Sequence, residues 1–238
     1  MLEVNGASRV GEFEHISFTI HEGEILGLIG LLGAGRTELA LALFGMTRLA
    51  SGEITIGGTT LRSPSNDAAI SAGIAYVSED RLSLGLNLRQ SVADNISITV
   101  LDDLGDCLGL IPSERRVSLA RSWIEKLNIR TAGTDVAAQT LSGGNQQRVV
   151  LSKWLATKPK VLILDGPTIG VDVRNKAGIH RLIRALAESG MAILLISDEV
   201  PEVYFICDRV LHMRTGRIIG EFIPGMTKES DLSEALYA

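Results

Sequence analysis

The chain has little of what marks several large classes of protein: few cysteines, no long apolar runs and no basic excess. Its longest purely apolar runs, such as Ala192 to Ile196, are far shorter than the roughly 18 residues that a membrane-spanning helix needs. Cys107 and Cys207 form no C-x-x-C pair and cannot build a disulfide framework, which favours a reducing compartment. The opening Met1-Leu2-Glu3-Val4-Asn5 lacks the basic segment and apolar stretch of a signal peptide, so none is expected.

Charge excludes a further class. The 238 residues carry a formal net charge of −5, which argues against the broad basic surface of nucleic-acid binding proteins. We therefore expect no nucleic-acid partner. Hydrophobic residues make up 45% of the chain and the mean hydropathy is +0.23, which predicts a globular protein. This length accommodates one large α/β domain, or such a domain with an inserted lobe.

What the sequence does contain is a glycine-rich segment between an apolar run, Ile25 to Ile29, and a helix-like run, Glu38 to Phe44. A strand, a glycine-rich loop and a helix in this order surround a small cavity with backbone N–H groups and a helix N-terminus, which suits a polyphosphate. The candidate nucleotide-binding residues are Gly30, Leu31, Leu32, Gly33, Ala34, Gly35, Arg36, Thr37 and Glu38.

This segment departs from the G-x-x-x-x-G-K-[ST] pattern at one position. Gly30 and Gly35 have the required spacing, and Thr37 supplies the hydroxyl that would bind Mg²⁺. Arg36 stands where the pattern has lysine, and a planar guanidinium on a longer stem is not a conservative replacement at a tight phosphate site. The segment alone therefore leaves a second interpretation open, a glycine-rich turn with no ligand.

Short, branched, nearly continuous apolar runs predict parallel strands buried on both faces. Residues 91–156 have helical spacing with little strand character, which predicts a helical lobe inserted into an α/β domain. Two glycines, Gly57-Gly58, predict a hairpin turn. The expected elements are strands within 2–29, at 53–56, 59–62, 74–77, 161–164 and 191–196, and helices at 38–44, 115–127, 175–189 and 228–238.

Two further motifs fall at informative places. An apolar strand ends at Asp165, a position that in phosphate-loop folds lies beside the loop and holds Mg²⁺ through water, although a solvated acid at a strand end is equally consistent. The second motif is rarer: a serine and paired glycines open a helix and offer N–H groups to an anion, with no strand delivering a cavity behind them. Its residues are Leu141, Ser142, Gly143, Gly144, Asn145 and Gln146.

The order of these motifs, followed by Pro167-Thr168 and Val171-Asp172, resembles the ATP-binding-cassette (ABC) ATPases over nearly the whole chain. The residues at 33–39, 76–81, 141–147 and 197–203 are most similar to the C-terminal half of the double-cassette ATP-binding protein of bacterial importers for ribose, galactose, xylose and related solutes. The resemblance implies an α/β fold: a phosphate-loop NTPase (RecA-like) core with an N-terminal antiparallel β subdomain and an inserted helical subdomain. In this division, residues 1–90 and 157–238 form the α/β core and β subdomain of a single nucleotide-binding domain, and 91–156 form the helical lobe.

The resemblance also implies the cofactors and partners. ATP and Mg²⁺ are the expected cofactors, with Thr37, Glu79 and Asp165 around the metal. Two cassettes meet head to tail, so that the signature residues 141–146 and the inter-cassette residues Val171 and Asp172 face the partner cassette, which is either an N-terminal half or a homo- or heterodimer mate. The further partners are a transmembrane permease, contacted around 79–88, and indirectly a periplasmic or extracellular solute-binding protein. The expected location is the cytoplasmic face of the bacterial inner membrane.

Three positions depart from the family. Arg36 replaces the lysine, Gly166 replaces the glutamate that orients the attacking water, and Asp198 replaces a histidine that contacts the γ-phosphate. A glycine cannot accept a proton, and an aspartate repels a γ-phosphate. We therefore expect a cassette that hydrolyses ATP poorly in its own site while its signature completes the partner's site. No adenine-stacking aromatic is evident, and Phe13 is the candidate in the region before the loop strand.

Two alternatives stay open from the sequence. The chain could be a non-hydrolysing ATP-binding regulatory module, in which binding drives only dimer closure. A soluble ABC protein of translation or DNA repair would need basic arms or coiled-coil inserts, and the sequence shows neither.

Overall fold

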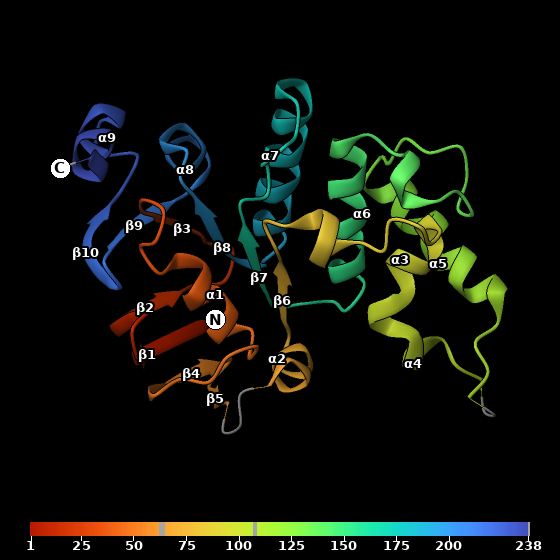
Figure 1. The fold of residues 1–238 in the computed structure, drawn as a ribbon, viewed down its shortest axis with the longest axis horizontal. Helices are drawn as coiled ribbons and strands as arrows, with labels where there is room; N and C mark the ends of the chain where they lie inside the picture. The colour runs from red at the N-terminus through yellow and green to blue at the C-terminus, as the bar shows by residue number, and fades with distance from the viewer. Residues whose placement is uncertain (62–64, 107–108, 238) are drawn as a thin grey trace. The chain divides into compact units, whose positions relative to one another are not determined.

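The computed structural model describes residues 1–61, 65–106 and 109–237, and its elements are labelled in Figure 1. The chain folds into two compact units. Unit 1 comprises Met1–Tyr76, Lys160–Pro167 and the chain from Ile183 on. Unit 2 comprises Val77–Pro159 and Thr168–Leu182. Each unit is therefore assembled from segments that are distant in the sequence.

Unit 1 contains an antiparallel sheet of order β2-β1-β4-β5. Its strands are β1 (Leu2–Arg9), β2 (Phe13–Ile20), β4 (Ser51–Ile56) and β5 (Thr59–Thr60). Alternating residues of β2, among them Ile16 and Ile20, are buried while their neighbours face solvent, as expected of a sheet packed on one face. The predicted hairpin at Gly57-Gly58 joins β4 and β5. Its second strand was predicted too long, since β5 ends at Thr60, and residue 62 lies outside the described residues.

A second, mostly parallel sheet has the order β10-β9-β3-β8-β7-β6. Every residue of its three central strands β3, β8 and β7 is buried, which explains their uninterrupted apolar sequences. The predicted runs at 25–29, 74–77, 161–164 and 191–196 are therefore confirmed as strands. The strands are β3 (Ile25–Ile29), β6 (Ile74–Val77), β7 (Val161–Asp165), β8 (Ala192–Ser197), β9 (Arg209–Arg214) and β10 (Arg217–Phe222).

The helices of unit 1 include one that directly follows the glycine-rich loop. This helix, α1 (Arg36–Leu43), starts two residues before the predicted run, and Gly45 with φ +79° follows its C-cap Phe44. Helix α8 packs against β3 and β8 and also against α9. The remaining helices of unit 1 are α2 (Asn66–Ala72), α8 (Val200–Ile206) and α9 (Glu229–Tyr237).

Unit 2 is mainly helical, and within 91–156, where the sequence has helical spacing, its elements are helices and 3₁₀ turns. Helix α3 packs against both α5 and α6, and a π-helical turn, Arg81–Gly85, packs against α6. Helix α7 (Val173–Glu188) begins in this unit. It corresponds to the helix predicted at 175–189, with a start two residues earlier and an end one residue earlier. The other elements are α3 (Val92–Ser97), a 3₁₀ turn Ile98–Val100, α4 (Leu101–Leu104), α5 (Ser113–Lys126), a 3₁₀ turn Ala138–Thr140 and α6 (Gly143–Leu155).

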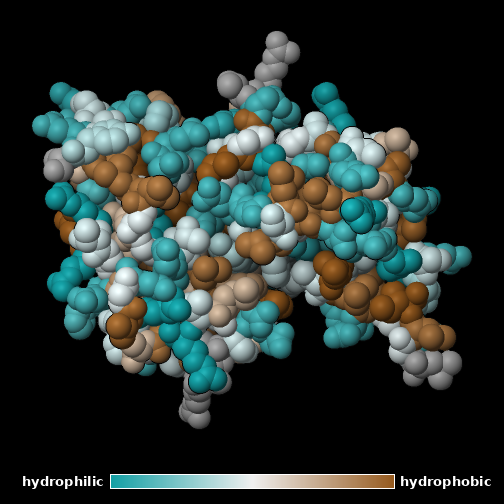
Figure 2. Space-filling view, viewed as in Figure 1, coloured by the Kyte–Doolittle hydropathy of each residue, from teal (hydrophilic) through white to brown (hydrophobic). Residues whose placement is uncertain are grey.

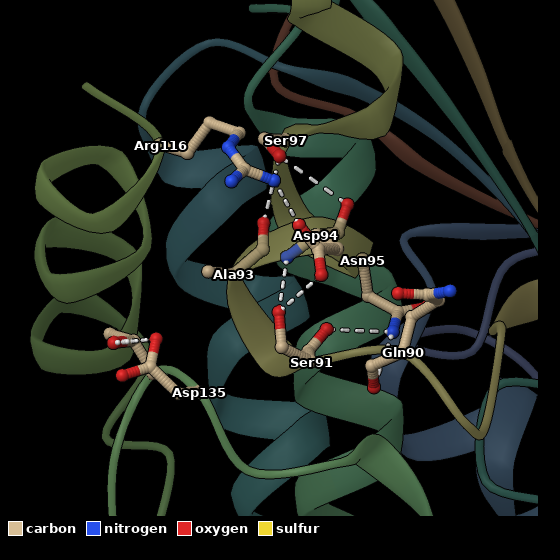
Figure 3. A network of polar contacts seen from close by, with 9 residues as sticks. Gln90, Ser91, Ala93, Asp94, Asn95, Ser97, Arg116 and Asp135 are labelled. Atoms are coloured by element: carbon tan, nitrogen blue, oxygen red, sulfur yellow. Dashed lines mark hydrogen bonds and ion pairs between the residues drawn. The ribbon is translucent and has the colours of Figure 1, made fainter. Parts of the chain in front are cut away.

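A polar network fixes the start of α3 (Figure 3). Ser91 caps the helix, because its hydroxyl accepts from the Asp94 N–H at 3.0 Å and donates to the Asp94 carboxylate at 2.7 Å. Arg116 of α5 forms an ion pair with the same carboxylate. Asn95 is 4% exposed, and its amide donates to the carbonyls of Asn87 and Ser91, both at 2.9 Å. The network joins the segment before α3 to α5, and it keeps the buried amide of Asn95 paired.

No helix among residues 1–61, 65–106 and 109–237 combines the length and apolar character needed to span a membrane.

The turn after β3 depends on glycine for two different reasons. Gly33 has φ +80° but open space where a Cβ would stand, whereas Gly35 has φ +96° and a Cβ there would lie 2.7 Å from the Glu12 carbonyl oxygen. We expect Gly33→Ala to lower the free energy of unfolding by about 1 kcal/mol, from the left-handed backbone alone. Gly35→Ala should lower the free energy of unfolding by about 1–3 kcal/mol more than Gly33→Ala does, because the backbone must also move. Urea unfolding of both variants measures the difference, and equal losses would contradict the steric account.

Lys153 of α6 is 8% exposed, and its Nζ donates to the Gly85 carbonyl at 2.5 Å. Burial lowers the pKa of Lys153 to about 8, against roughly 10.4 in an unfolded chain. Between these values the unfolded chain binds more protons than the folded one, so stability rises with pH, by at most about 1.4 kcal/mol per pH unit. Lys153→Met should remove this rise, and Lys126→Met, which alters an exposed lysine of α5, should keep it. Urea unfolding at about pH 8 and pH 9.5 measures the change in the free energy of unfolding with pH. An unchanged slope in Lys153→Met would show that another group causes it.

Candidate functional site

Strand register in unit 1 gathers several of the predicted residues at one edge of the parallel sheet. Ile29 of β3 pairs with Ser197 of β8, and Ile196 of β8 pairs with Asp165 of β7. Because these strands are parallel, their carboxyl ends meet at the same edge, where ligands bind in open α/β sheets. The glycine-rich loop follows β3, Gly166 follows β7 and Asp198 follows β8, so all three segments lie at this edge.

The glycine-rich loop has an exposed tip and a buried return. Leu31, Leu32 and Gly33 are exposed, whereas Ala34 is buried. The Ala34 N–H donates to the Leu31 carbonyl at 3.0 Å, and the Ala34 carbonyl accepts from the Gly216 N–H at 3.0 Å, which ties the loop to the turn between β9 and β10. Helix α1 starts immediately afterwards, with Arg36, Thr37 and Glu38 half-buried in its first turn. The N–H groups of that turn have no partners within the helix and can bind an anion.

Asp165 ends β7 and is 2% exposed. The Tyr76 hydroxyl of β6 donates to its Oδ2 at 3.2 Å. Tyr76 was not among the predicted site residues, although its place near the end of an apolar strand was a signal for it. This hydrogen bond fixes the orientation of a carboxylate that water barely reaches.

The two positions after these strand ends differ in exposure. Gly166 is buried and has φ +55°, and its N–H donates to the Ile196 carbonyl at 2.9 Å. Asp198 is exposed. The backbone conformation at Gly166 disfavours a residue with a side chain, so the glycine suits its geometry.

Two cavities border the loop within unit 1. One of about 340 Å³ is lined by the loop residues 31–34, by 212–215 and by Leu236 and Tyr237. The other, of about 410 Å³, is lined by 11–14, Gly33 and 215–217. Phe13 is 1% exposed, so its ring is part of the core. A ring this buried has little face free for an adenine, which disfavours Phe13, the candidate that the sequence offers before the loop strand, as a stacking residue.

The rarer serine–glycine motif lies in unit 2 at the start of α6. Ser142 is exposed at the N-cap, and its hydroxyl oxygen accepts from the Asn145 side-chain amide at 2.8 Å. The hydroxyl proton remains available for donation to an incoming acceptor. Gln146 instead points inward, is 7% exposed, and donates to the Ala138 carbonyl at 3.3 Å, so its side chain supports the turn before the motif.

The other predicted residues of unit 2 lie in two loops. Glu79 is exposed and precedes the π-helical turn, which Asp80 caps by accepting from the Ser83 N–H at 3.0 Å. Hydrogen bonds from the backbone N–H and the side chain of Ser83 lower the pKa of Asp80. Val171 is 6% exposed, and Asp172 accepts from both the backbone and the side-chain amide of Asn175 at the start of α7.

The structure thus brings the glycine-rich loop, Asp165, Gly166 and Asp198 to one edge of unit 1. It places residues 141–146, Glu79, Val171 and Asp172 in unit 2. No group of three or more His, Cys, Asp or Glu side chains suited to a metal occurs in the part of the chain that the structure describes. Asp165 is the buried carboxylate at this edge of unit 1, and Mg²⁺ is usually held by one or two carboxylates together with phosphate oxygens and water.

Comparisons with known proteins find relatives over most of this chain. The ribose import ATP-binding protein RbsA 1 of Agrobacterium fabrum is 46% identical over 93% of this chain and 43% of its own length. The ribose import ATP-binding protein RbsA of Halalkalibacterium halodurans is 44% identical over 92% of this chain and 44% of its own. The chain thus spans less than half the length of these relatives.

Solved structures share the fold at lower identity. A nucleotide-free ATP-binding cassette of an ABC transporter superposes with a TM-score of 0.83 at 22% identity, over 99% of this chain and 95% of that one. The dimeric structure of a bacterial ABC transporter cassette gives 0.79 at 19% identity, over 94% and 99%. The family model described as ABC transporter matches residues 13–169. The chain belongs to the ABC transporter family of ATP-binding proteins, and its fold is that of an ABC cassette.

Proposed function

We propose that this chain is the nucleotide-binding domain of a sugar-type ABC importer, which binds ATP with Mg²⁺ and completes the ATP site of a second cassette. The exposed Ser142 at the start of α6 carries the proposal, because its hydroxyl proton and the N–H groups of Gly143 and Gly144 can donate to an acceptor from outside the chain. The names of the relatives, which are ribose import ATP-binding proteins, support sugar import.

In the proposed site of unit 1, backbone N–H groups of residues 30–38 hold the phosphates of ATP. Thr37 and Asp165 hold Mg²⁺, which would supply charge neutralisation of the phosphates when bound. The buried, Tyr76-oriented carboxylate of Asp165 supports this assignment, since carboxylate oxygens are the protein ligands that Mg²⁺ usually takes beside substrate phosphates. Glu79, which the resemblance assigns to the metal, lies on an exposed segment of unit 2.

We propose that hydrolysis in this site is weak. The edge next to the loop presents Gly166, which has no side chain to orient water, and Asp198, whose charge opposes a γ-phosphate. Arg36 adds a guanidinium where a compact ammonium would fit the phosphates better. Binding depends on the backbone of the loop and is retained, whereas the side chains that act on water are missing.

The proposed partners are a second cassette, a membrane permease and, indirectly, a solute-binding protein, with the chain held at the cytoplasmic face of the inner membrane by the permease. A groove of about 240 Å³ in unit 2 supports permease docking, because it is lined by Leu84, Asn87, Asp94, Ile98 and Lys153 among others. Leu84 is 72% exposed and Ile98 57% exposed. Figure 2 shows apolar side chains at the surface over elements that Figure 1 colours yellow and green.

The alternative, a non-hydrolysing module that only closes a dimer, differs in one measurable outcome. In both cases the isolated chain binds ATP and turns it over far more slowly than the roughly 1–100 per second of ordinary phosphoryl-transfer enzymes. Only the importer proposal requires that a competent second cassette gain turnover from this chain. Turnover of ATP by the isolated chain at those ordinary rates would contradict weak hydrolysis.

The decisive experiment measures ATP turnover of a competent second cassette with and without this chain. We expect turnover to require the chain and to fall by about 10²-fold or more with Ser142→Arg, which places a bulky cation over the donors that should meet the γ-phosphate. Ser118→Arg alters an exposed serine of α5; it is the control and should retain activity. Turnover that survives Ser142→Arg would remove the signature role, and a chain that binds ATP but never supports turnover would favour the regulatory module.

The docking groove is tested separately by capture of a detergent-solubilised ribose-importer permease on immobilised chain. Leu84→Glu should reduce capture by about tenfold, because a carboxylate replaces apolar contact area in the groove. Leu110→Glu alters a residue of unit 2 that is 64% exposed and does not line the groove, and it should leave capture unchanged. Equal effects of the two substitutions would contradict the groove as the docking site.

A further inference from the structure

Arg81 of unit 2 contacts a loop that lies far from it in sequence. Its Nη1 donates to the Ile169 carbonyl at 2.5 Å, and its Nη2 donates to the Gly170 carbonyl at 3.0 Å. These two carbonyls immediately precede Val171 and Asp172. A guanidinium is a planar fork, so one side chain holds two successive carbonyls in a fixed orientation, which an ammonium cannot do.

The paired glycines of the signature pack against the same place. A Cβ on Gly143 would lie 3.0 Å from Arg81 Nη2 and 3.0 Å from the Gly170 carbonyl oxygen. A Cβ on Gly144 would lie 2.8 Å from the Cβ of Asn175, whose amide is bonded to Asp172. The glycines therefore allow the start of α6 to approach Arg81 and the 169–175 segment closely, in addition to any contact with a nucleotide.

The electrostatics make Arg81 an unusual choice for mere packing. A cation beside the first residue of α6 opposes the positive end of that helix dipole. The guanidinium Nε is also buried without a hydrogen-bond partner. Two charge-assisted hydrogen bonds to carbonyls offset these costs. An apolar side chain would fill the space without these costs. The guanidinium is therefore better explained by the two hydrogen bonds with which it holds the loop.

We propose that Arg81 is a positioning residue that joins three segments of unit 2 into one rigid body: the π-helical turn after Glu79, the loop that carries Val171 and Asp172, and the start of α6. A displacement of the π-helical turn, whose Leu84 and Gly85 line the docking groove, is then transmitted to both elements that face the second cassette. This inference rests on the proposed function, because in it a movement of the permease at the docking groove displaces Ser142.

The physical link is tested on the full chain without any partner. In Arg81→Lys, amide hydrogen exchange should accelerate by about tenfold at Val171 in the 169–172 segment and at Asn145 in the 143–145 segment, whose N–H groups donate to the Thr168 and Ser142 carbonyls. This is the loss expected when one hydrogen bond to a charged group no longer restrains the loop. Arg121→Lys alters an exposed arginine of α5 and should leave both segments protected as in the wild type. Unchanged exchange at both segments in Arg81→Lys would overturn the proposal.

The functional link is tested on the chain assembled with its competent second cassette. Arg81→Lys should lower kcat for ATP by about tenfold and change KM by less than about twofold, because the phosphate loop that binds this ATP belongs to the second cassette. A defect in folding alone would lower the fraction of active protein and the melting temperature together. Arg81→Lys with wild-type kcat, while Ser142→Arg abolishes turnover, would reject the positioning role and leave the proposed function intact.

A double-mutant cycle separates a shared contact from two independent ones. If Arg81 acts through the start of α6, Arg81→Lys combined with Gly143→Ala should lower kcat little further than the more damaging single variant. A multiplicative loss would show that the two residues act separately and would contradict the proposed rigid body. If Ser142→Arg also leaves turnover unchanged, the proposed function fails instead.

Discussion

The alignment of the carboxyl ends of β3, β8 and β7 is the constraint on which the arrangement of unit 1 depends. Each strand is buried on both faces, and its backbone hydrogen bonds pair it with its neighbours in one register. Ile29 and Asp165 are thereby brought to one edge through their pairs with Ser197 and Ile196. The loop and the acid are thus positioned by hydrophobic burial that lies entirely outside the site.

Close backbone approach is the second recurring feature, and it occurs in both units. In unit 1, a Cβ on Gly30 would lie 2.3 Å from the Met213 carbonyl oxygen, so the loop starts directly against β9. In unit 2, the signature glycines lie against Arg81 and Asn175. Both motifs therefore need glycine for packing contacts within their own unit, whether or not a ligand binds. Glycine at such positions reports a packing constraint as well as a binding site.

The sequence predicts what depends on local pattern and misses what depends on distant partners. Uninterrupted apolar runs identified β3, β7 and β8, and the glycine spacing located the loop. Strands β9 and β10 escaped prediction because their apolar stretches are short and are interrupted by His212 in β9 and by Gly220 and Glu221 in β10. The hydrogen-bond partners of Tyr76 and Arg81 could not be inferred, since they are 89 and 88–89 residues away in the chain. Such pairs become visible only once the strands and loops are placed.

The proposed division of labour follows from which atoms each task uses. Holding a polyphosphate relies on backbone N–H groups, which persist through the replacement of side chains as long as the turn keeps its glycines. Orienting water and stabilising charge on the γ-phosphate rely on side chains, and those are altered at Arg36, Gly166 and Asp198. The signature again uses backbone N–H groups and one hydroxyl. A cassette can therefore lose chemistry in its own loop while keeping what a partner needs, provided that Ser142 is held in place by its own unit.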